Sequence, residues 1–368
     1  MTERFEPSEG CLPLYAPGLD GIIAAETVLS DVDGAGGRLV LRGRPIEELA
    51  GKLTFEQGAA FLWRGFLPDE DLSDVKAGFA AARVAARQCL PAMKAAPGGL
   101  GVYELMRLGL EALPLTGTVR DAIVISGSLG YLLPAADALA HGRQIGAPDP
   151  SLSISADLLR LLRGKPARQA EVAGLDRYLV TILDHGLNAS TFAARVIAST
   201  GADMRSAVLG AFGALKGPLH GGAPGPVLDM LDAIGDPEDA ARWIDEELAA
   251  GRRLMGFGHR IYRTRDPRAD VLREGLAPLR QQSGRLRSAE AIESVALAAL
   301  KRHRPSRVLE TNVEFYTAVL LDAVGVDRSL FTPLFALGRS VGWCAHILEQ
   351  GKAGKLIRPM SRYVGQAG

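Results

Sequence analysis

Stretches with helical character, separated by proline or glycine, dominate this 368-residue chain. Strand signals are scarce: only residues 38–42, which follow the glycine-rich turn 33–37, predict a small hairpin. Because runs of β character do not alternate with helices, the pattern argues against a parallel α/β sheet. The sequence therefore predicts a mainly α-helical protein, with helices over residues 54–66, 69–87, 100–112, 119–140, 151–162, 170–200, 206–215, 237–250, 268–282, 289–303, 313–324 and 332–350.

The length of the chain suits two domains rather than one. A break at residues 216–218 and the glycine at Gly325 are the candidate boundaries. We expect a large helical domain made of residues 1–219 plus 325–368, and a small domain over residues 220–324. The motif residues described below would lie in or at the edge of the small domain, where domain closure could assemble a site.

Charge and composition narrow the classes of protein. Lys plus Arg and Asp plus Glu both total 42, so the net charge is zero and nothing indicates nucleic acid as the main partner. The hydrophobic content of 47% and the charged content of 23% are typical of a globular protein. Cys11, Cys89 and Cys344 form no CxxC pair, which argues against a disulfide framework or a cysteine zinc site.

No segment indicates a membrane or export. The first residues lack the apolar core of a signal peptide. The least polar stretch, residues 122–136, is short for a transmembrane span and contains Gly127, Gly130 and Pro134, so we expect a buried core helix. A cytoplasmic protein follows by default.

Two histidines lie 39 residues apart, each between glycines: His220 in Gly-Pro-Leu-His-Gly-Gly and His259 in Gly-Phe-Gly-His-Arg. Glu314 follows in Asn-Val-Glu-Phe-Tyr. One glycine-flanked histidine is usually only a turn residue, but two imidazoles and a carboxylate can move a proton at a carbon beside a carbonyl. Arginines near His259 indicate a ligand with several carboxylates or phosphates. They are Arg260, Arg263, Arg265 and Arg268.

These motifs, in this order, resemble those of the citrate synthase family. The second histidine segment continues to Asp-Pro-Arg268, and the acidic segment reads Asn312-Val-Glu314-Phe-Tyr. Further segments similar to family signatures lie at residues 18–34, 184–191, 334–343 and 356–359. The resemblance extends from residue 18 to residue 365.

The resemblance implies an almost entirely α-helical fold, an active site between a large and a small domain, and a homodimer. It also implies condensation of an acyl-CoA with oxaloacetate and hydrolysis of the thioester, without a metal or other cofactor. Glu314 would take the α-proton, and His220 would donate a hydrogen bond to the thioester oxygen. His259 would polarise and protonate the oxaloacetate carbonyl. We expect both histidines to be neutral donors.

The resemblance also assigns carboxylate-binding residues. His185, Arg268 and Arg339 match positions that hold the carboxylates of oxaloacetate and product. Arg358 matches an arginine that reaches in from the other subunit. Without the motifs, His185 fits a core histidine in a long helix, Arg339 a helix-packing residue, and Arg358 a solvated charge in the tail.

The resemblance implies fewer residues for binding CoA. Arg263 matches a residue that contacts CoA phosphates, and the other expected neighbours are Asn312 and the backbone from Gly256 to Gly258. The remaining histidines match no motif, and no spacing such as HxxxH indicates a metal site. They are His141, His303 and His346.

The chain departs from the family pattern mainly on the acyl-CoA side. Glu314 stands where the family normally has aspartate, and misplacing a reacting group by about 1 Å can cost on the order of a hundredfold in rate. Glu310 and Thr311 replace the usual Tyr-Pro. We expect that oxaloacetate recognition is kept while the acyl preference or the rate differs.

Acetyl-CoA and oxaloacetate are the expected substrates, and two alternatives stay open. One is a 2-methylcitrate synthase that uses propionyl-CoA. The other is a catalytically weak relative that binds CoA esters or oxaloacetate as a sensor. The family signature begins by residue 18, which leaves no room for the extra N-terminal domain of some allosteric members. We therefore expect no inhibition by NADH at a dedicated site.

Overall fold

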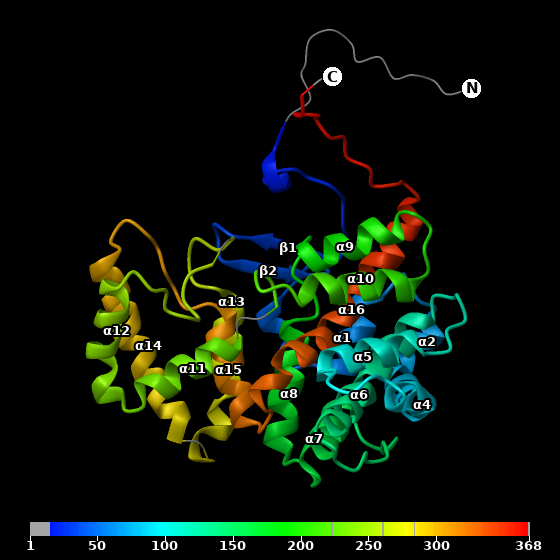
Figure 1. Ribbon diagram of the computed structural model, residues 1–368, viewed down its shortest axis with the longest axis horizontal. Helices are drawn as coiled ribbons and strands as arrows, with labels where there is room; N and C mark the ends of the chain where they lie inside the picture. Colours follow the sequence, from blue (N-terminus) through cyan, green and yellow to red (C-terminus); the bar gives the residue numbers. More distant parts are fainter. Residues whose placement is uncertain (1–14, 222–223, 260, 283, 367–368) are drawn as a thin grey trace.

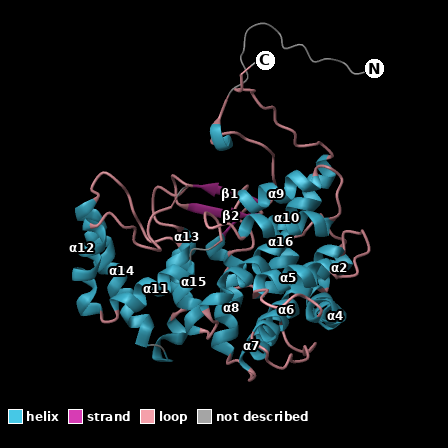
Figure 2. Cartoon of the chain, in the orientation of Figure 1, coloured by secondary structure: helices cyan, strands magenta, loops and turns pink. Residues whose placement is uncertain are grey.

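The fold is mainly α-helical, as the sequence predicts, with a single small antiparallel sheet among the described residues (Figure 2). The computed structural model describes residues 15–221, 224–259, 261–282 and 284–366. Strands β1 (Ser30–Asp33) and β2 (Arg38–Leu41) form the predicted hairpin, and β3 (Arg44–Pro45) extends it. The helices are α1 (Phe55–Leu62), α2 (Asp69–Ser73), α3 (Val75–Ala85), α4 (Leu90–Lys94), α5 (Val102–Glu111), α6 (Asp121–Ala140), α7 (Ile154–Arg163), α8 (Gln169–Thr181), α9 (Ala189–Ala198), α10 (Met204–Leu215), α11 (Pro224–Ile234), α12 (Ala240–Ala249), α13 (Pro267–Gly275), α14 (Gly284–His303), α15 (Val313–Ala323) and α16 (Phe331–Ala353).

Helix α6 is the predicted core helix. By length and composition it could cross a membrane, but 89% of its most apolar 18-residue window is buried inside the protein. Its small residues allow α3 to approach closely: a Cβ on Gly127 would lie 2.9 Å from the Phe79 Cα atom. The absence of charge in residues 122–136 therefore reflects burial among other helices.

The prediction of one long helix over residues 170–200 is wrong, because the chain breaks between α8 and α9. Helix α8 ends at Thr181, and Gly186 in the connecting segment adopts a left-handed conformation with φ of 61°, which a continuous α-helix does not contain. The Asn188 side chain then accepts hydrogen bonds from the N–H groups of Ser190 and Thr191 and begins α9. His185 consequently lies in the break, not inside a helix.

Other helices differ from the sequence-based expectation in their ends. The segment 69–87 divides at Asp74, whose side chain caps α3, and the segment 268–282 ends its α-helical part at Gly275. Helix α11 was not predicted, because Pro224, Gly225 and Pro226 look like a turn. Proline is tolerated in the first turn of a helix, where the N–H groups have no intrahelical partner.

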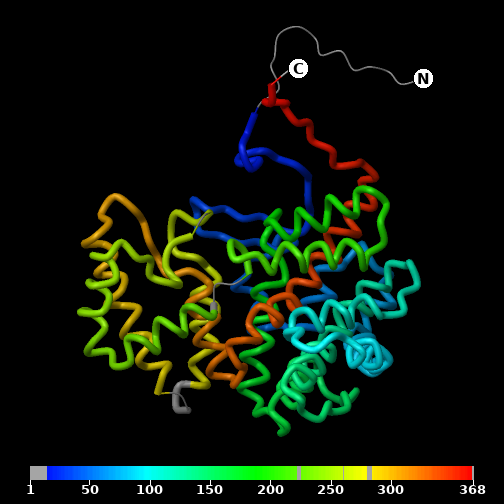
Figure 3. The backbone as a smooth tube through the Cα atoms, viewed as in Figure 1, coloured from blue at the N-terminus to red at the C-terminus, as the bar shows by residue number. Residues whose placement is uncertain are grey.

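Two groups of helices meet along the centre of the molecule (Figure 1). Helices α11, α12, α13, α14 and α15 form one group, and α1 to α10 with α16 form the other (Figure 3). Helix α13 packs against both α8 and α15, and α16 packs against α6, α9 and α10. The segments near the two ends of the chain leave the body at separate places and converge above it (Figure 1).

Candidate active site

The segment that carries His259 pairs with the segment that leads into Glu314. The Gly258 N–H donates to the Glu310 carbonyl at 2.7 Å, and the Asn312 N–H donates to the Gly256 carbonyl at 2.9 Å. Both glycines have positive φ, and a Cβ on Gly256 would lie 2.9 Å from the Phe315 Cβ. Glycine is therefore required for the two segments to come this close.

The surroundings of His259 select one tautomer of the ring. Its Nδ1 accepts hydrogen bonds from the N–H groups of Ile261 and Tyr262, each at 3.0 Å. A neutral ring must then carry its proton on Nε2. Burial, with help from Arg268, lowers the pKa of His259 to about 4. At neutral pH the ring is thus a neutral donor that points its Nε2–H away from the loop.

Arg268 is buried beside this donor. The Asp266 carboxylate accepts from its Nε at 3.0 Å and from its Nη2 at 2.8 Å. The same Nη2 lies 3.3 Å from His259 Nε2. Both nitrogens carry hydrogens, so an oxygen atom of a ligand could accept from the two of them together.

Arg339 is a second buried guanidinium, with 2% of its surface exposed. Its Nε donates to the Ile182 carbonyl at 2.6 Å, and its guanidinium lies 4.8 Å from the centre of the Phe335 ring. No ion pair joins it to a carboxylate of the described residues. Burial lowers its pKa to about 10, against an opposing effect of Asp184. Such a buried cation needs an anion.

His185 and His220 complete a group of three neutral histidines. His185 is buried, its Nε2 lies 3.1 Å from the Tyr262 hydroxyl, and its ring centre is 5.9 Å from that of His259. His220 Nε2 lies 2.8 Å from Ser190 Oγ, which also accepts from Trp343 Nε1 at 3.1 Å. Burial is the largest cause that lowers both pKa values, that of His220 to about 4.

Glu314 is the carboxylate whose pKa best suits a general base at neutral pH. The Asn312 side chain caps α15 by accepting from the Glu314 N–H at 3.0 Å, and its amide donates to the Gly258 carbonyl at 2.8 Å. Burial raises the pKa of Glu314 to about 7, against an opposing effect of Arg268. A group with this pKa can take a proton and return it near neutral pH.

Some predicted residues lie apart from this group. Arg358 is exposed in the segment after α16, and Arg265 is paired with Asp270 at 2.6 Å. Arg263 is exposed on the rim of a neighbouring pocket. Arg260 lies outside the described residues.

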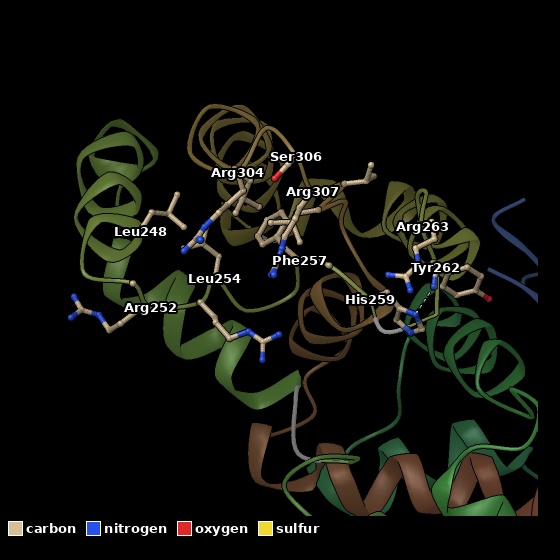
Figure 4. Close-up of a pocket in the computed structure, with 16 residues that line it drawn as sticks. Leu248, Arg252, Leu254, Phe257, His259, Tyr262, Arg263, Arg304, Ser306 and Arg307 are labelled. Atoms are coloured by element: carbon tan, nitrogen blue, oxygen red, sulfur yellow. Dashed lines mark hydrogen bonds between the residues drawn. The ribbon is translucent and has the colours of Figure 1, made fainter. Parts of the chain in front are cut away.

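A pocket of about 860 Å³ opens beside His259 and extends toward α12 and α14 (Figure 4). Its described lining contains no acidic side chain and includes Tyr262, Phe257 and the exposed Arg263. The other cations of the lining were not predicted, although the pair 252–253 and the basic run 301–307 are present in the sequence. These cations are Arg252, Arg253, Arg304 and Arg307. The pocket suits a long ligand that carries several phosphates.

Metal ligation finds no support in the described part of the chain. No group of three or more histidine, cysteine or carboxylate side chains there could hold a metal ion. The three site histidines instead contact hydroxyl groups, backbone N–H groups and an arginine.

The sequence matches a protein-family model, and the match covers most of the chain. The model is described as the citrate synthase C-terminal domain and matches residues 18–360. A protein of Mycobacterium tuberculosis named putative citrate synthase 2 is 39% identical, over 95% of this chain and 93% of that protein. The 2-methylcitrate synthase of the same species is 34% identical, over 96% of this chain and 91% of that protein.

A solved structure shares the fold. It is the citrate synthase of the archaeon Thermoplasma acidophilum in a ternary complex with carboxymethyl coenzyme A and oxaloacetate. The TM-score is 0.85 at 27% identity, over 96% of this chain and 97% of that chain.

Proposed function

The chain belongs to the citrate synthase family, and we propose that it condenses acetyl-CoA with oxaloacetate to form citrate and CoA. The observation that carries the proposal is the pairing of a neutral His259, which presents Nε2–H, with the buried Arg268, next to the segment that holds Glu314. The reaction needs no cofactor, since the CoA thioester is itself a substrate.

The roles of the residues follow from their protonation states. The Glu314 carboxylate takes a proton from the α-carbon of the thioester, while His220 donates a hydrogen bond to the thioester oxygen. His220 can donate through Nδ1 when the Ser190 hydroxyl turns its single proton from Asn188 Oδ1, 2.8 Å away, to His220 Nε2. The enol carbon attacks the ketone carbon of oxaloacetate, and His259 gives its Nε2 proton to the developing alkoxide. Water then cleaves the thioester to a carboxylate and the free thiol.

Oxaloacetate would bind among the buried cations. Arg268, Arg339 and His259 all lie close enough to His185 to lower its pKa, and Arg339 brings a positive charge that has no ion pair with a carboxylate of the described residues. Bidentate pairs between arginine and carboxylate are strong in such dry surroundings. The arginine-lined pocket beside His259 would hold the phosphates of CoA.

Propionyl-CoA is the second candidate acyl donor, because a relative of 34% identity is named 2-methylcitrate synthase. The test measures thiol release from acetyl-CoA and from propionyl-CoA, each with and without oxaloacetate. The ratio of kcat/KM values for the two thioesters identifies the reaction. Absence of oxaloacetate-dependent release from either thioester would overturn the proposed function.

The domain division stays a proposal in the form that the sequence suggested. Residues 1–219 plus 325–368 would form the large domain and residues 220–324 the small one, with the site between them. The grouping of α11 to α15 beside the remaining helices supports it (Figure 1). We place the protein in the cytoplasm, consistent with Cys89 and Cys344, which are buried and unpaired.

Removing the arginines of the pocket should weaken binding of acyl-CoA and leave oxaloacetate binding unchanged. We expect Arg304→Ala and Arg307→Ala each to raise the KM for acetyl-CoA by roughly tenfold, because a hydrogen bond to a charged group contributes about 1.5–3 kcal/mol. Steady-state kinetics with both substrates varied gives the two KM values. Arg302→Ala is the matched control, since Arg302 pairs with Asp245 at 3.2 Å and does not line the pocket.

A homodimer is part of the proposed function. Near the ends of the described chain, large apolar side chains are exposed: Ile23 at 88%, Met360 at 82% and Val364 at 84%. The two terminal segments touch where Arg362 lies 4.9 Å from the centre of the Tyr15 ring. Apolar side chains this exposed support an interface with a second copy. Arg358 lies in the same segment and would reach the partner's site.

Mixing two defective variants tests whether Arg358 acts across the interface. Glu314→Gln lacks the base, and Arg358→Ala lacks the bridging arginine. In a mixed dimer one site contains Glu314 together with an Arg358 from the other subunit, so an equal mixture that has exchanged subunits should recover about a quarter of the wild-type activity. Activity is measured at low oxaloacetate after refolding the variants together. No recovery, with mixed dimers present by mass spectrometry, would place Arg358 in its own subunit's site or outside the site.

A further inference from the structure

A buried carboxylate on α14, that of Glu293, accepts hydrogen bonds from residues on both sides of Glu314 in the sequence. Glu293 is 6% exposed, and its Oε1 accepts from the Thr311 hydroxyl at 2.5 Å. Its Oε2 accepts from the Tyr316 hydroxyl. Thr311 and Tyr316 are themselves fully buried, so these hydrogen bonds are shielded from water. Glu293 thus holds one residue three positions before Glu314 and another two positions after it.

The same carboxylate also reaches the segment that follows His259. Arg265 Nη2 lies 3.6 Å from Glu293 Oε1, while Arg265 Nε donates to Asp270 at 2.6 Å. Phe257 forms an antiparallel bridge with Thr311, so the hydroxyl that Glu293 holds belongs to the residue paired with the His259 loop. One side chain of α14 therefore connects the segment after His259, the residue that precedes the Asn312 cap of α15, and Tyr316 within α15.

Two of these features are departures from the family pattern. Thr311 and Glu314 are the positions at which the motif resemblance led us to expect proline and aspartate. Unlike proline, Thr311 has a hydroxyl to donate, and the carboxylate of Glu314 extends one methylene further than that of an aspartate. A longer base needs its backbone held in a specific place, because a misplacement of about 1 Å can cost on the order of a hundredfold in rate.

We propose that Glu293 is a positioning residue for the reaction, and that its hydrogen bonds to Thr311 and Tyr316 place the longer Glu314 side chain against the thioester. Glu293 does not touch the substrate. It acts through the backbone that carries the base. This inference rests on the proposed function.

The first test replaces Glu293 with alanine and with glutamine. Glu293→Ala should lower kcat about tenfold, while the Kd of oxaloacetate stays unchanged because Arg268 and Arg339 keep their places. Glu293→Gln retains an acceptor oxygen and should recover most of the lost kcat. Exchange of the acetyl-CoA methyl hydrogens into heavy water, measured by NMR, should slow in parallel with kcat, because it reports proton removal alone.

A second set of variants guards against a failure of Glu293→Ala to fold. Thr311→Val and Tyr316→Phe each remove one hydroxyl at nearly constant volume and should each lower kcat. Adding Thr311→Val to Glu293→Ala should cause no further loss, since the two act as one unit. Tyr103→Phe is the matched control: its buried hydroxyl donates to the Phe212 carbonyl at 2.9 Å, away from Glu293, and kcat should not change.

The outcomes separate this inference from the proposed function. If the unmodified chain releases thiol only with oxaloacetate and the Glu293, Thr311 and Tyr316 variants keep its kcat, positioning by Glu293 is overturned and the proposed function stands. An equal loss of kcat in Tyr103→Phe would also overturn it, because any buried hydroxyl would then matter. Absence of thiol release from the unmodified chain overturns both.

Discussion

Glu314→Gln should lower kcat for thiol release by about a thousandfold, because a positioned general base contributes roughly 10²–10⁴ to a rate. The amide cannot take the α-proton, yet it retains the shape of the side chain and the Asn312 cap of α15. Oxaloacetate should bind with unchanged affinity, since under the proposed assignment its carboxylates would be held by Arg268 and Arg339. Calorimetric titration with oxaloacetate, beside the thiol assay, checks both parts. Undiminished turnover would remove Glu314 from the mechanism.

The raised pKa of Glu314 sets the direction in which activity and stability change with pH. Burial raises the pKa of Glu314 from 4.5 to about 7, so kcat/KM of the unmodified chain should rise with pH through about 7 as the carboxylate forms. The folded chain binds this proton more tightly than the unfolded chain. The contribution of Glu314 to the free energy of unfolding is therefore lost as the pH rises from 4.5 to about 7. Glu314→Gln should therefore lack the activity limb and be no less stable than the unmodified chain at pH 8.

Arg339→Met should raise the Kd of oxaloacetate by about a hundredfold, a loss that corresponds to roughly 2.7 kcal/mol. Arg339 is buried without an ion pair to a described carboxylate, so its positive charge is available to a ligand. Removing an unpaired buried charge also removes its desolvation cost, and we expect little change in the free energy of unfolding. Calorimetry and urea unfolding measure the two quantities. Wild-type affinity for oxaloacetate in Arg339→Met would contradict the assignment.

Arg268→Met provides the contrast, because this arginine has a buried partner. Its removal leaves the Asp266 carboxylate, which is 1% exposed, without a cation. Breaking a buried pair in this way costs about 3–5 kcal/mol of stability. The two arginine variants should therefore both lose oxaloacetate binding, while only Arg268→Met loses stability.

Much of the secondary structure could be predicted from local sequence. The Thr54 cap of α1, the uncharged core helix α6 and the hairpin after the glycine turn all have local chemical causes, and each is present. The prediction failed where one residue outweighed the pattern. Helix α8 ends at Thr181, and the left-handed Gly186 and the capping Asn188 precede α9, all inside a stretch that is apolar enough to continue as one helix. A pattern averaged over many residues does not register such a break.

For the site, too, the residues could be predicted from the sequence, whereas their protonation states could not. Glycine-framed histidines, the acidic residue and the arginines near His259 were visible as motifs, and the structure brings His185, His220, His259, Arg268, Arg339 and Glu314 toward the same region. The tautomer of His259 and the raised pKa of Glu314 were not visible, because they depend on burial and on backbone N–H groups of folded segments. The cations Arg304 and Arg307 became candidates only because they line the same pocket as His259.

By itself the sequence determined the helical class, the family and the chemical types that the site contains, because these depend on residue identity and on spacing along the chain. Tertiary structure decided how the buried charges and hydroxyl groups are arranged. Arg268 is paired with Asp266, two residues before it at the start of α13, whereas no carboxylate of the described residues forms an ion pair with Arg339. Glu293 on α14 binds two hydroxyl groups that flank Glu314, so these hydrogen bonds join different segments of the chain. Their strength comes from the exclusion of water, which is a property of the packed molecule and not of any segment.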